Sequence, residues 1–192
     1  MYKLCKTDES SKRQRQIEDV LLKLMLEKHY DEITVSEICL AANMPRKAFY
    51  RYFDGKEGVK QALIYHTLTD FSVFQIGKSG IDHKLREEFE YFFAFWKGKR
   101  ELLAAFDKSG LTGLLVDNAT SYAMEEFSSI KGYLYDSDER DKIIAYQFAI
   151  CGLMTMTINW YRSGFAESIP NLARVATKII TRPLFENLSR TE

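Results

Sequence analysis

The sequence predicts an all-α protein. Apolar residues recur at spacings of three and four along the chain, as the buried face of a helix requires, and no run alternates convincingly with the period of two expected of a strand. Only three prolines and ten glycines interrupt the 192 residues. The content of 46% hydrophobic and 14% aromatic residues suffices for a substantial core, which argues against disorder.

Local signals place the first helices. Ile17, Leu21 and Leu24 share one face of a first helix. Thr34 and Glu37 have the spacing of a capping box, in which each side chain accepts a hydrogen bond from the other residue's backbone N–H. Along the whole chain, helices are predicted over residues 9–28, 34–42, 45–53, 56–75, 82–96, 99–108, 111–131, 139–163 and 167–187.

No low-complexity linker and no internal repeat divides the chain. The long helix from residue 56 to 75 joins a small N-terminal unit to a larger remainder, so the connection is a helix and not a flexible tether. We therefore expect two domains, at residues 9–55 and 56–192.

Charge and cysteine content exclude several classes of protein. With 27 basic and 27 acidic residues the chain is formally neutral, so it does not coat nucleic acid by bulk charge. Its three cysteines are widely spaced without a CxxC, and its histidines are isolated, so we expect no disulfide framework, no metal site and no cofactor. The N-terminus lacks the apolar segment of a signal peptide, which favours a cytoplasmic location.

One segment has the length of a membrane span. Residues 143–161 are uncharged and approach the roughly 20 residues that a spanning helix needs. The segment contains Gln147 and Asn159, and Lys142 and Arg162 flank it closely. A helix buried in protein on most sides is therefore the preferred interpretation, and no membrane partner is expected.

The third predicted helix combines cations with aromatic residues. Residues 43–60 carry five Lys/Arg and two Asp/Glu. On a helical wheel Phe49 and Phe53 fall together and would pack inward, while Lys47, Ala48 and Arg51 lie opposite. Two short helices joined by a turn, the second with a cationic outer face, have the form of a helix-turn-helix that enters the major groove of DNA. The wheel alone equally allows a solvated cationic face.

Residues 13–60 resemble the N-terminal domain of tetracycline-repressor (TetR/AcrR-type) transcriptional regulators. The segment ITVSEICLAANMPRKAFYRYFDGKEGV carries the resemblance, through the pattern Thr-x-x-x-Ile-Ala, a turn, and Tyr-x-x-Phe-x-x-Lys-Glu. The resemblance implies base contacts from the start of the third helix and phosphate contacts from its tyrosines, from the second helix and from the lysine that opens the fourth. The predicted DNA-binding residues are Thr34, Ser36, Pro45, Arg46, Lys47, Ala48, Tyr50, Arg51, Tyr52 and Lys56.

Four positions depart from the family's pattern. Asn43 stands at the usual turn glycine, which is tolerable because asparagine enters the left-handed region more readily than most residues. His29 stands where a glycine usually ends the first helix, so we expect slight strain there. Pro45 replaces a common serine, and Lys47 takes a position that is often glycine, so the choice of operator is expected to differ.

In the family that residues 13–60 resemble, the C-terminal helices sense a ligand and form a dimer. Small residues on one stripe of the helix at 139–163 allow a second helix to approach closely, and with the last helix they suit a four-helix dimer interface. Packing within the monomer is the alternative. The predicted interface residues are Ala145, Ala149, Gly152, Met156, Asn159, Leu172, Val175, Ala176 and Ile179.

The middle helices are rich in aromatic residues, most of which must belong to the core. A pocket between bundle helices is nevertheless the usual ligand site, so we expect an apolar or aromatic small molecule. The predicted lining residues are Phe74, Phe92, Trp96, Phe106, Tyr122, Tyr146 and Trp160.

Together these patterns and the resemblance predict a ligand-responsive DNA-binding regulator that binds a palindromic operator as a homodimer. The resemblance implies that this regulator is a repressor. An enzyme is not expected, because the sequence has no Gly-rich phosphate loop, nucleophile elbow or metal cluster. The alternative is a helical protein-interaction module without specific DNA binding.

Overall fold

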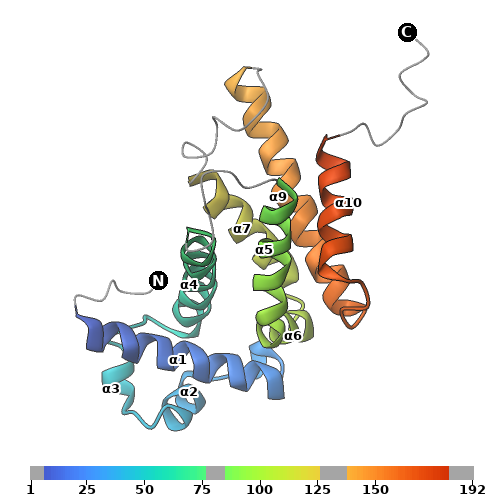
Figure 1. Ribbon diagram of the computed structural model, residues 1–192. Coiled ribbons are helices and arrows are strands. Elements are labelled where there is room, and N and C mark those ends of the chain that lie inside the picture. Colours follow the sequence, from blue (N-terminus) through green and yellow to red (C-terminus); the bar gives the residue numbers. More distant parts are fainter. Residues whose placement is uncertain (1–6, 77–84, 126–137, 182–192) are drawn as a thin grey trace, which may run out of the picture. The chain divides into compact units, whose positions relative to one another are not determined.

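The structure is a computed structural model that describes residues 7–76, 85–125 and 138–181, apart from the side chains of residues 73–76. Within these ranges the regular elements are helices and no β-strand occurs, which confirms the all-α prediction (Figure 1). The elements are α1 (Asp8–Glu27), the 3₁₀ turn η1 (Tyr30–Glu32), α2 (Val35–Ala41), α3 (Arg46–Phe49), α4 (Lys56–Ile76), α5 (Leu85–Gly98), α6 (Arg100–Lys108), α7 (Thr112–Glu125), α9 (Glu139–Arg162) and α10 (Ile169–Thr181).

Most predicted helix ends lie within three residues of the observed ones. The predicted stretches at 82–84, 126–131 and 182–187 lie outside the described residues. The third helix is the exception, because α3 ends at Phe49 and not near Phe53. Beyond Phe49 the backbone tightens, with Arg51 N–H bonding Ala48 O at 3.1 Å and Tyr52 N–H bonding Phe49 O at 2.9 Å. These three-residue bonds end the helix in a 3₁₀-like turn.

Two compact units make up the chain. Unit 1 comprises residues 1–70 and 100–122, and unit 2 comprises residues 71–99 and 123–192. Residues 100–122 therefore pack with the N-terminal helices. This division by packing does not follow the two predicted domains, whose functional boundary at residues 55 and 56 stays a prediction.

In unit 1, α6 holds the C-terminal end of α1. The Lys108 ammonium donates to Leu26 O at 2.8 Å and to Glu27 O at 2.7 Å. The Ser109 hydroxyl accepts the Tyr30 backbone N–H at 3.0 Å. These bonds satisfy backbone groups that a helix end leaves unpaired. The apolar core beneath them includes Ile17, Leu21, Met25, Ile38, Phe49, Phe53, Leu103 and Phe106, all at 1% exposure or less.

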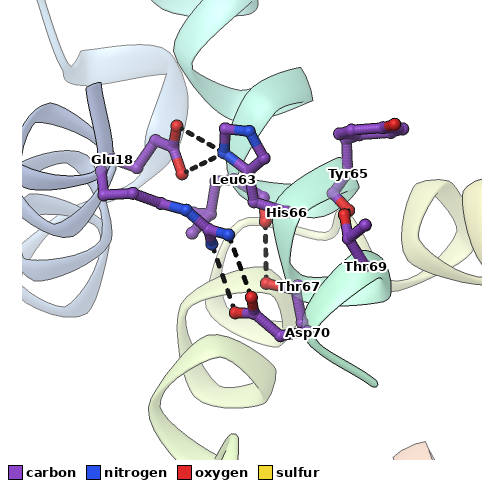
Figure 2. Close-up of polar contacts among 8 residues, drawn as sticks. Glu18, Leu63, Tyr65, His66, Thr67, Thr69 and Asp70 are labelled. Carbon is purple, nitrogen blue, oxygen red and sulfur yellow. Dashed lines mark hydrogen bonds and ion pairs between the residues drawn. The ribbon is translucent and has the colours of Figure 1, made fainter. Parts of the chain in front are cut away.

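Two polar pairs join α1 to α4 (Figure 2). His66 Nδ1 lies 2.9 and 3.0 Å from the two carboxylate oxygens of Glu18, a geometry in which the ring N–H donates to the carboxylate. Arg15 donates to both carboxylate oxygens of Asp70, at 2.9 and 3.2 Å. Glu18 is only 1% exposed, and this burial raises the pKa of its carboxyl although His66 acts in the opposite direction. The two helices are therefore joined by charged groups as well as by apolar contact.

Unit 2 is built on the aromatic face of α5. Phe93 contacts Trp160 of α9 edge-on, with ring centroids 5.8 Å apart, and Phe92 lies 6.3 Å from Trp96. The Trp160 indole N–H donates to Glu167 O at 2.8 Å. The Trp96 indole N–H is buried and has no acceptor among the residues that the structure describes. A buried donor without a partner costs roughly 1–3 kcal/mol.

Helix α9 is only partly covered by its own chain. It meets the length and composition of a membrane span, but only 28% of its most apolar window is buried inside the chain, and a single such helix is weak evidence for a membrane. The exposed positions fall on one stripe, and on it Ile144 is 56% and Phe148 75% exposed. Within its own chain α9 is therefore covered on one face, and burial of its other sides in protein stays a prediction.

Candidate nucleic-acid interface

Helix α2 begins with the predicted capping box. The Thr34 backbone N–H donates to Glu37 Oε2 at 2.8 Å, and the Glu37 N–H donates to the Thr34 hydroxyl at 3.3 Å. Lys28, which caps the C-terminal end of α1, also donates to Glu37. The Lys28 hydrogen bond, followed by those from Thr34, lowers the pKa of Glu37 to about 2. The start of α2 is thus tied to the end of α1.

The turn between α2 and α3 has the backbone expected from its sequence. Asn43 adopts a positive φ of 47°, in the left-handed region, which supports its assignment to the turn glycine position. Arg13 of α1 donates to Ala42 O at 3.0 Å and so fixes the C-terminal end of α2. The strain expected at His29 is absent, because its φ of −63° is ordinary and its ring accepts the Asp31 N–H as the cap of η1.

Three predicted DNA-binding residues form one exposed cluster. Arg46 of α3 donates to the Ser36 hydroxyl of α2 at 3.2 Å and to the Tyr50 hydroxyl at 3.3 Å. The hydrogen bond with Tyr50 raises the pKa of Arg46, so the guanidinium remains charged. We call Ser36, Arg46 and Tyr50 the outer cluster. Groups that can donate to a phosphate or a base edge therefore stand together on the solvent side of both helices.

The remaining side chains of α3 separate into two faces. Phe49 and Phe53 are fully buried, with ring centroids 5.7 Å apart, as the wheel predicted. Lys47 and Arg51 are exposed on the opposite side. Of the other predicted residues, Pro45 is exposed, whereas Ala48 and Tyr52 are half-buried. The buried phenylalanines therefore hold a short helix whose cations face solvent.

Two predicted phosphate contacts already have intramolecular partners. The Thr34 hydroxyl donates to Glu37 at 2.9 Å, so its single proton is used. The Lys56 ammonium donates to Tyr30 O and Asp31 O, both at 3.0 Å, and lies 4.6 Å from the centre of the Tyr30 ring. An ammonium has three donors, so Lys56 can hold η1 and still bind an anion.

Tyr30, which the sequence analysis did not predict as part of the site, contacts three residues at the start of α4. Its hydroxyl donates to Glu57 at 2.5 Å, and Glu57 pairs with Lys60 at 2.8 Å. Lys60 lies over the Tyr30 ring, 4.3 Å from its centre. Burial, followed by the bond to Glu57, raises the pKa of Tyr30. These partners lie more than twenty residues apart, beyond the reach of any local pattern.

The predicted pocket residues are divided between the two units. Phe106 and Tyr122 lie in unit 1, whereas Phe92, Trp96, Tyr146 and Trp160 lie in unit 2. Phe92, Trp96, Phe106 and Trp160 are buried, and Tyr122 and Tyr146 are half-buried. The side chain of Phe74 lies outside the described residues. A hollow of about 330 Å³ in unit 1 is lined by α4 and α7 residues and by none of these seven, so the pocket stays a prediction.

The predicted interface residues differ in their exposure. Gly152, Asn159 and Ile179 are exposed, and Ala176 is buried within its own chain at 2% exposure. The half-buried members are Ala145, Ala149, Met156, Leu172 and Val175. Ala176 is therefore not available to a partner, whereas the stripe around Gly152 is.

Residues 17–63, which include the capping box and the outer cluster, match bacterial regulatory proteins of the tetR family. This segment is therefore similar to the N-terminal domain of TetR-family regulators. A search of curated proteins finds no match for the chain. The TetR assignment therefore rests on the DNA-binding segment and on the fold.

Solved structures share this TetR fold over most of the chain. The fatty acid degradation regulator FadR from Bacillus halodurans has 18% identity and a TM-score of 0.60, and the match covers 90% of this chain and 96% of that one. FadR from Bacillus subtilis, in complex with stearoyl-CoA, has 16% identity and a TM-score of 0.61 over 89% and 99%. A TetR-like regulator from Rhodococcus sp. RHA1 has 14% identity and a TM-score of 0.62 over 88% and 93%. Identities this low show the fold alone.

The capping box makes the stability of this interface sensitive to acid. Because the pKa of Glu37 is lowered from 4.5 to about 2, its stabilising contribution is present above pH 4.5 and is lost as the pH falls toward 2. Glu37→Gln should therefore lower the free energy of unfolding most at neutral pH, and the difference from the unmodified chain should shrink in acid. Urea unfolding across this pH range measures the difference in unfolding free energy, with Asp117→Asn at an exposed position of α7 as the control. A difference that is constant with pH would contradict the assignment.

Proposed function

We propose that this chain is a ligand-responsive transcriptional repressor that binds a palindromic operator as a homodimer in the cytoplasm. The outer cluster carries the proposal. Arg46 joins the two helices of the helix-turn-helix through Ser36, and the buried Phe49 fixes α3 beneath it. Lys47 and Arg51 extend the same solvent face. Such a face can enter a major groove, with the cations meeting base edges and phosphates.

A second copy of the chain is the proposed partner of α9. Seven of its exposed residues recur at spacings of three and four along the helix: Asp141, Ile144, Phe148, Gly152, Thr155, Asn159 and Arg162. No atom lies within 4 Å of a Cβ built on Gly152, so a partner helix can approach closely there. Ile179 and Ile180 of α10 add exposed apolar surface. The exposed side chains of Ile144 and Phe148, one turn apart, give α9 an apolar surface that a partner chain could cover.

The proposed effector is an apolar or aromatic molecule that also carries a hydrogen-bond acceptor. The aromatic face of α5 supports the apolar part, as does the binding of stearoyl-CoA by the structurally similar FadR of Bacillus subtilis. The buried indole N–H of Trp96 has no acceptor among the described residues, which supports a hydrogen-bond acceptor on the effector. An effector that binds better to the dimer with its recognition helices splayed would shift the population away from DNA. The proposal includes no catalytic step.

Sequencing of genomic fragments captured by the purified protein tests the proposal. Recovery of one palindromic site by the unmodified chain, and its loss with Tyr50→Ala, would support the regulator. Absence of any enriched site at low salt, where phosphate contacts are strongest, would favour a protein-interaction module instead. Genes beside a recovered site would then supply candidate effectors, and release of the captured DNA by one of them would support the ligand response.

Two substitutions should separate base contacts from phosphate contacts. Lys47→Ala should relax sequence preference at one position of each half-site by about 1–3 kcal/mol. Tyr50→Ala should weaken binding to operator and unrelated DNA alike. Fluorescence anisotropy with operator and scrambled duplexes measures both effects, with Lys23→Ala at an exposed position of α1 as the control for loss of a positive charge. Unchanged affinity and preference in both variants would show that α3 does not contact DNA.

A further inference from the structure

A groove of about 260 Å³ lies in unit 2 between α5 and α10, which run side by side (Figure 1). It is lined by Arg86, Arg174, Thr177, Lys178 and Thr181. The four residues from α10 recur at spacings of three and four, so they share one face of that helix. Three of the five lining residues are cations, and none is a carboxylate.

The charges on the α10 side of the groove are uncompensated within that helix. Helix α10 carries Arg174 and Lys178 and no acidic residue. Arg174 donates through Nε and Nη2 to the Asn171 side-chain oxygen, at 3.0 and 2.6 Å. This neutral acceptor orients the guanidinium without cancelling its charge. Two cations on adjacent turns repel each other, and that repulsion would be relieved by an anion held between them.

Helix α5 supplies the third cation. Arg86 bonds Glu90 through Nε at 3.2 Å, with both side chains at least a third exposed. A surface pair of this kind contributes little stability, so it does not oppose an anion strongly. Glu87 and Glu88 also lie in the first turn of α5, but they do not line the groove. The groove itself therefore remains cationic.

The side chains that line the groove indicate which ligand it can bind. The Thr177 and Thr181 hydroxyls donate to Ala173 O and Thr177 O, both at 2.7 Å, so they form neutral walls and the cations do the binding. Arginine binds phosphate oxygens in pairs, and three cations suit a group with two or more negative charges. The volume is at the small end for a drug-sized ligand, so it suits a head group. We propose that this groove binds the phosphate or diphosphate group of a small soluble molecule.

This site goes beyond the proposed function, because it is separate from the outer cluster and its test needs no DNA. Sodium pyrophosphate titrated into the full-length protein by calorimetry at low ionic strength should bind saturably, at one site per chain, with a Kd tighter than about 1 mM. Arg174→Gln and Lys178→Gln should each weaken binding about tenfold, since each removes a charge-assisted contact. Arg140→Gln, which removes an exposed cation from α9, should leave binding unchanged.

Three results would overturn the proposal. They are no saturable binding of pyrophosphate, an equal loss in the Arg140→Gln control, and retention of binding when Arg174 and Lys178 are both replaced. Unchanged thermal unfolding of the variants excludes loss of the fold as the cause. A parallel flotation assay with anionic phospholipid vesicles distinguishes the source of the phosphate. Binding to vesicles without binding to pyrophosphate would assign the groove to a lipid head group and contradict a soluble ligand.

Discussion

Replacing Phe148 with glutamate is expected to convert the protein to a monomer and to weaken operator binding by about a hundredfold or more, because two linked half-site contacts would become independent. Phe148 is 75% exposed in the single chain, so the substitution should change the stability of the monomer by no more than about 0.5 kcal/mol. Burying two glutamates across a two-fold interface would instead oppose association strongly.

Light scattering gives the oligomeric state, and anisotropy with the operator gives the affinity. Leu85→Glu is the matched control, because Leu85 is an exposed apolar residue of the same unit, at 41% exposure, that lies on α5. It should leave both measurements unchanged. A dimer that survives Phe148→Glu would remove α9 from the interface, and an unmodified chain that is monomeric at micromolar concentration would remove the dimer itself.

The second large effect concerns the pair between α1 and α4. His66→Leu should lower the free energy of unfolding by roughly 3 kcal/mol, because it leaves the buried Glu18 carboxylate without its donor. Burial already raises the pKa of Glu18 above 4.5, and loss of His66 would raise it further. When a carboxyl has a higher pKa in the folded than in the unfolded protein, the free energy of unfolding falls as the pH rises through that range. The deficit should therefore be larger at neutral pH than near pH 5.

Urea unfolding at both pH values measures this effect. The double variant Glu18→Leu with His66→Leu should be less destabilised than His66→Leu alone, because no buried charge remains. Gln61→Leu on the exposed side of α4 controls for the new apolar side chain. A loss below about 1 kcal/mol in His66→Leu, or a double variant worse than the single one, would show that the pair is not a buried charged contact.

Features fixed within a few residues could be predicted from the sequence. The capping box at Thr34 and the inward face of Phe49 depend on helical spacing alone, and the structure has both. Asn43 could likewise be placed in the turn, because few residues other than glycine adopt a positive φ. The resemblance to TetR regulators added the prediction that the cationic outer face of the third helix contacts DNA, whereas helical spacing alone equally allowed a solvated surface.

Contacts between distant segments could not be predicted. Arg13 reaches the end of α2, and Tyr30 gathers Lys56 and Lys60, only because the helices cross at particular points. The early end of α3 depends on whether backbone bonds span three residues or four, which the helical period does not distinguish. The exposure of α9 could not be predicted either, since an apolar composition does not say which neighbour covers it.

The packing of α6 against α1 bears on the order in which the protein acquires its structure during synthesis. Unit 1 is discontinuous, so the Lys108 and Ser109 bonds that close the end of α1 need a segment made some eighty residues later. Contacts of such long sequence separation form late and slow folding. We therefore expect unit 1 to complete its packing only after residues 100–122 have been synthesised. A chain that ends before residue 100 would lack the Lys108 and Ser109 bonds, so its segment at residues 27–30 should be less stable than in the full chain.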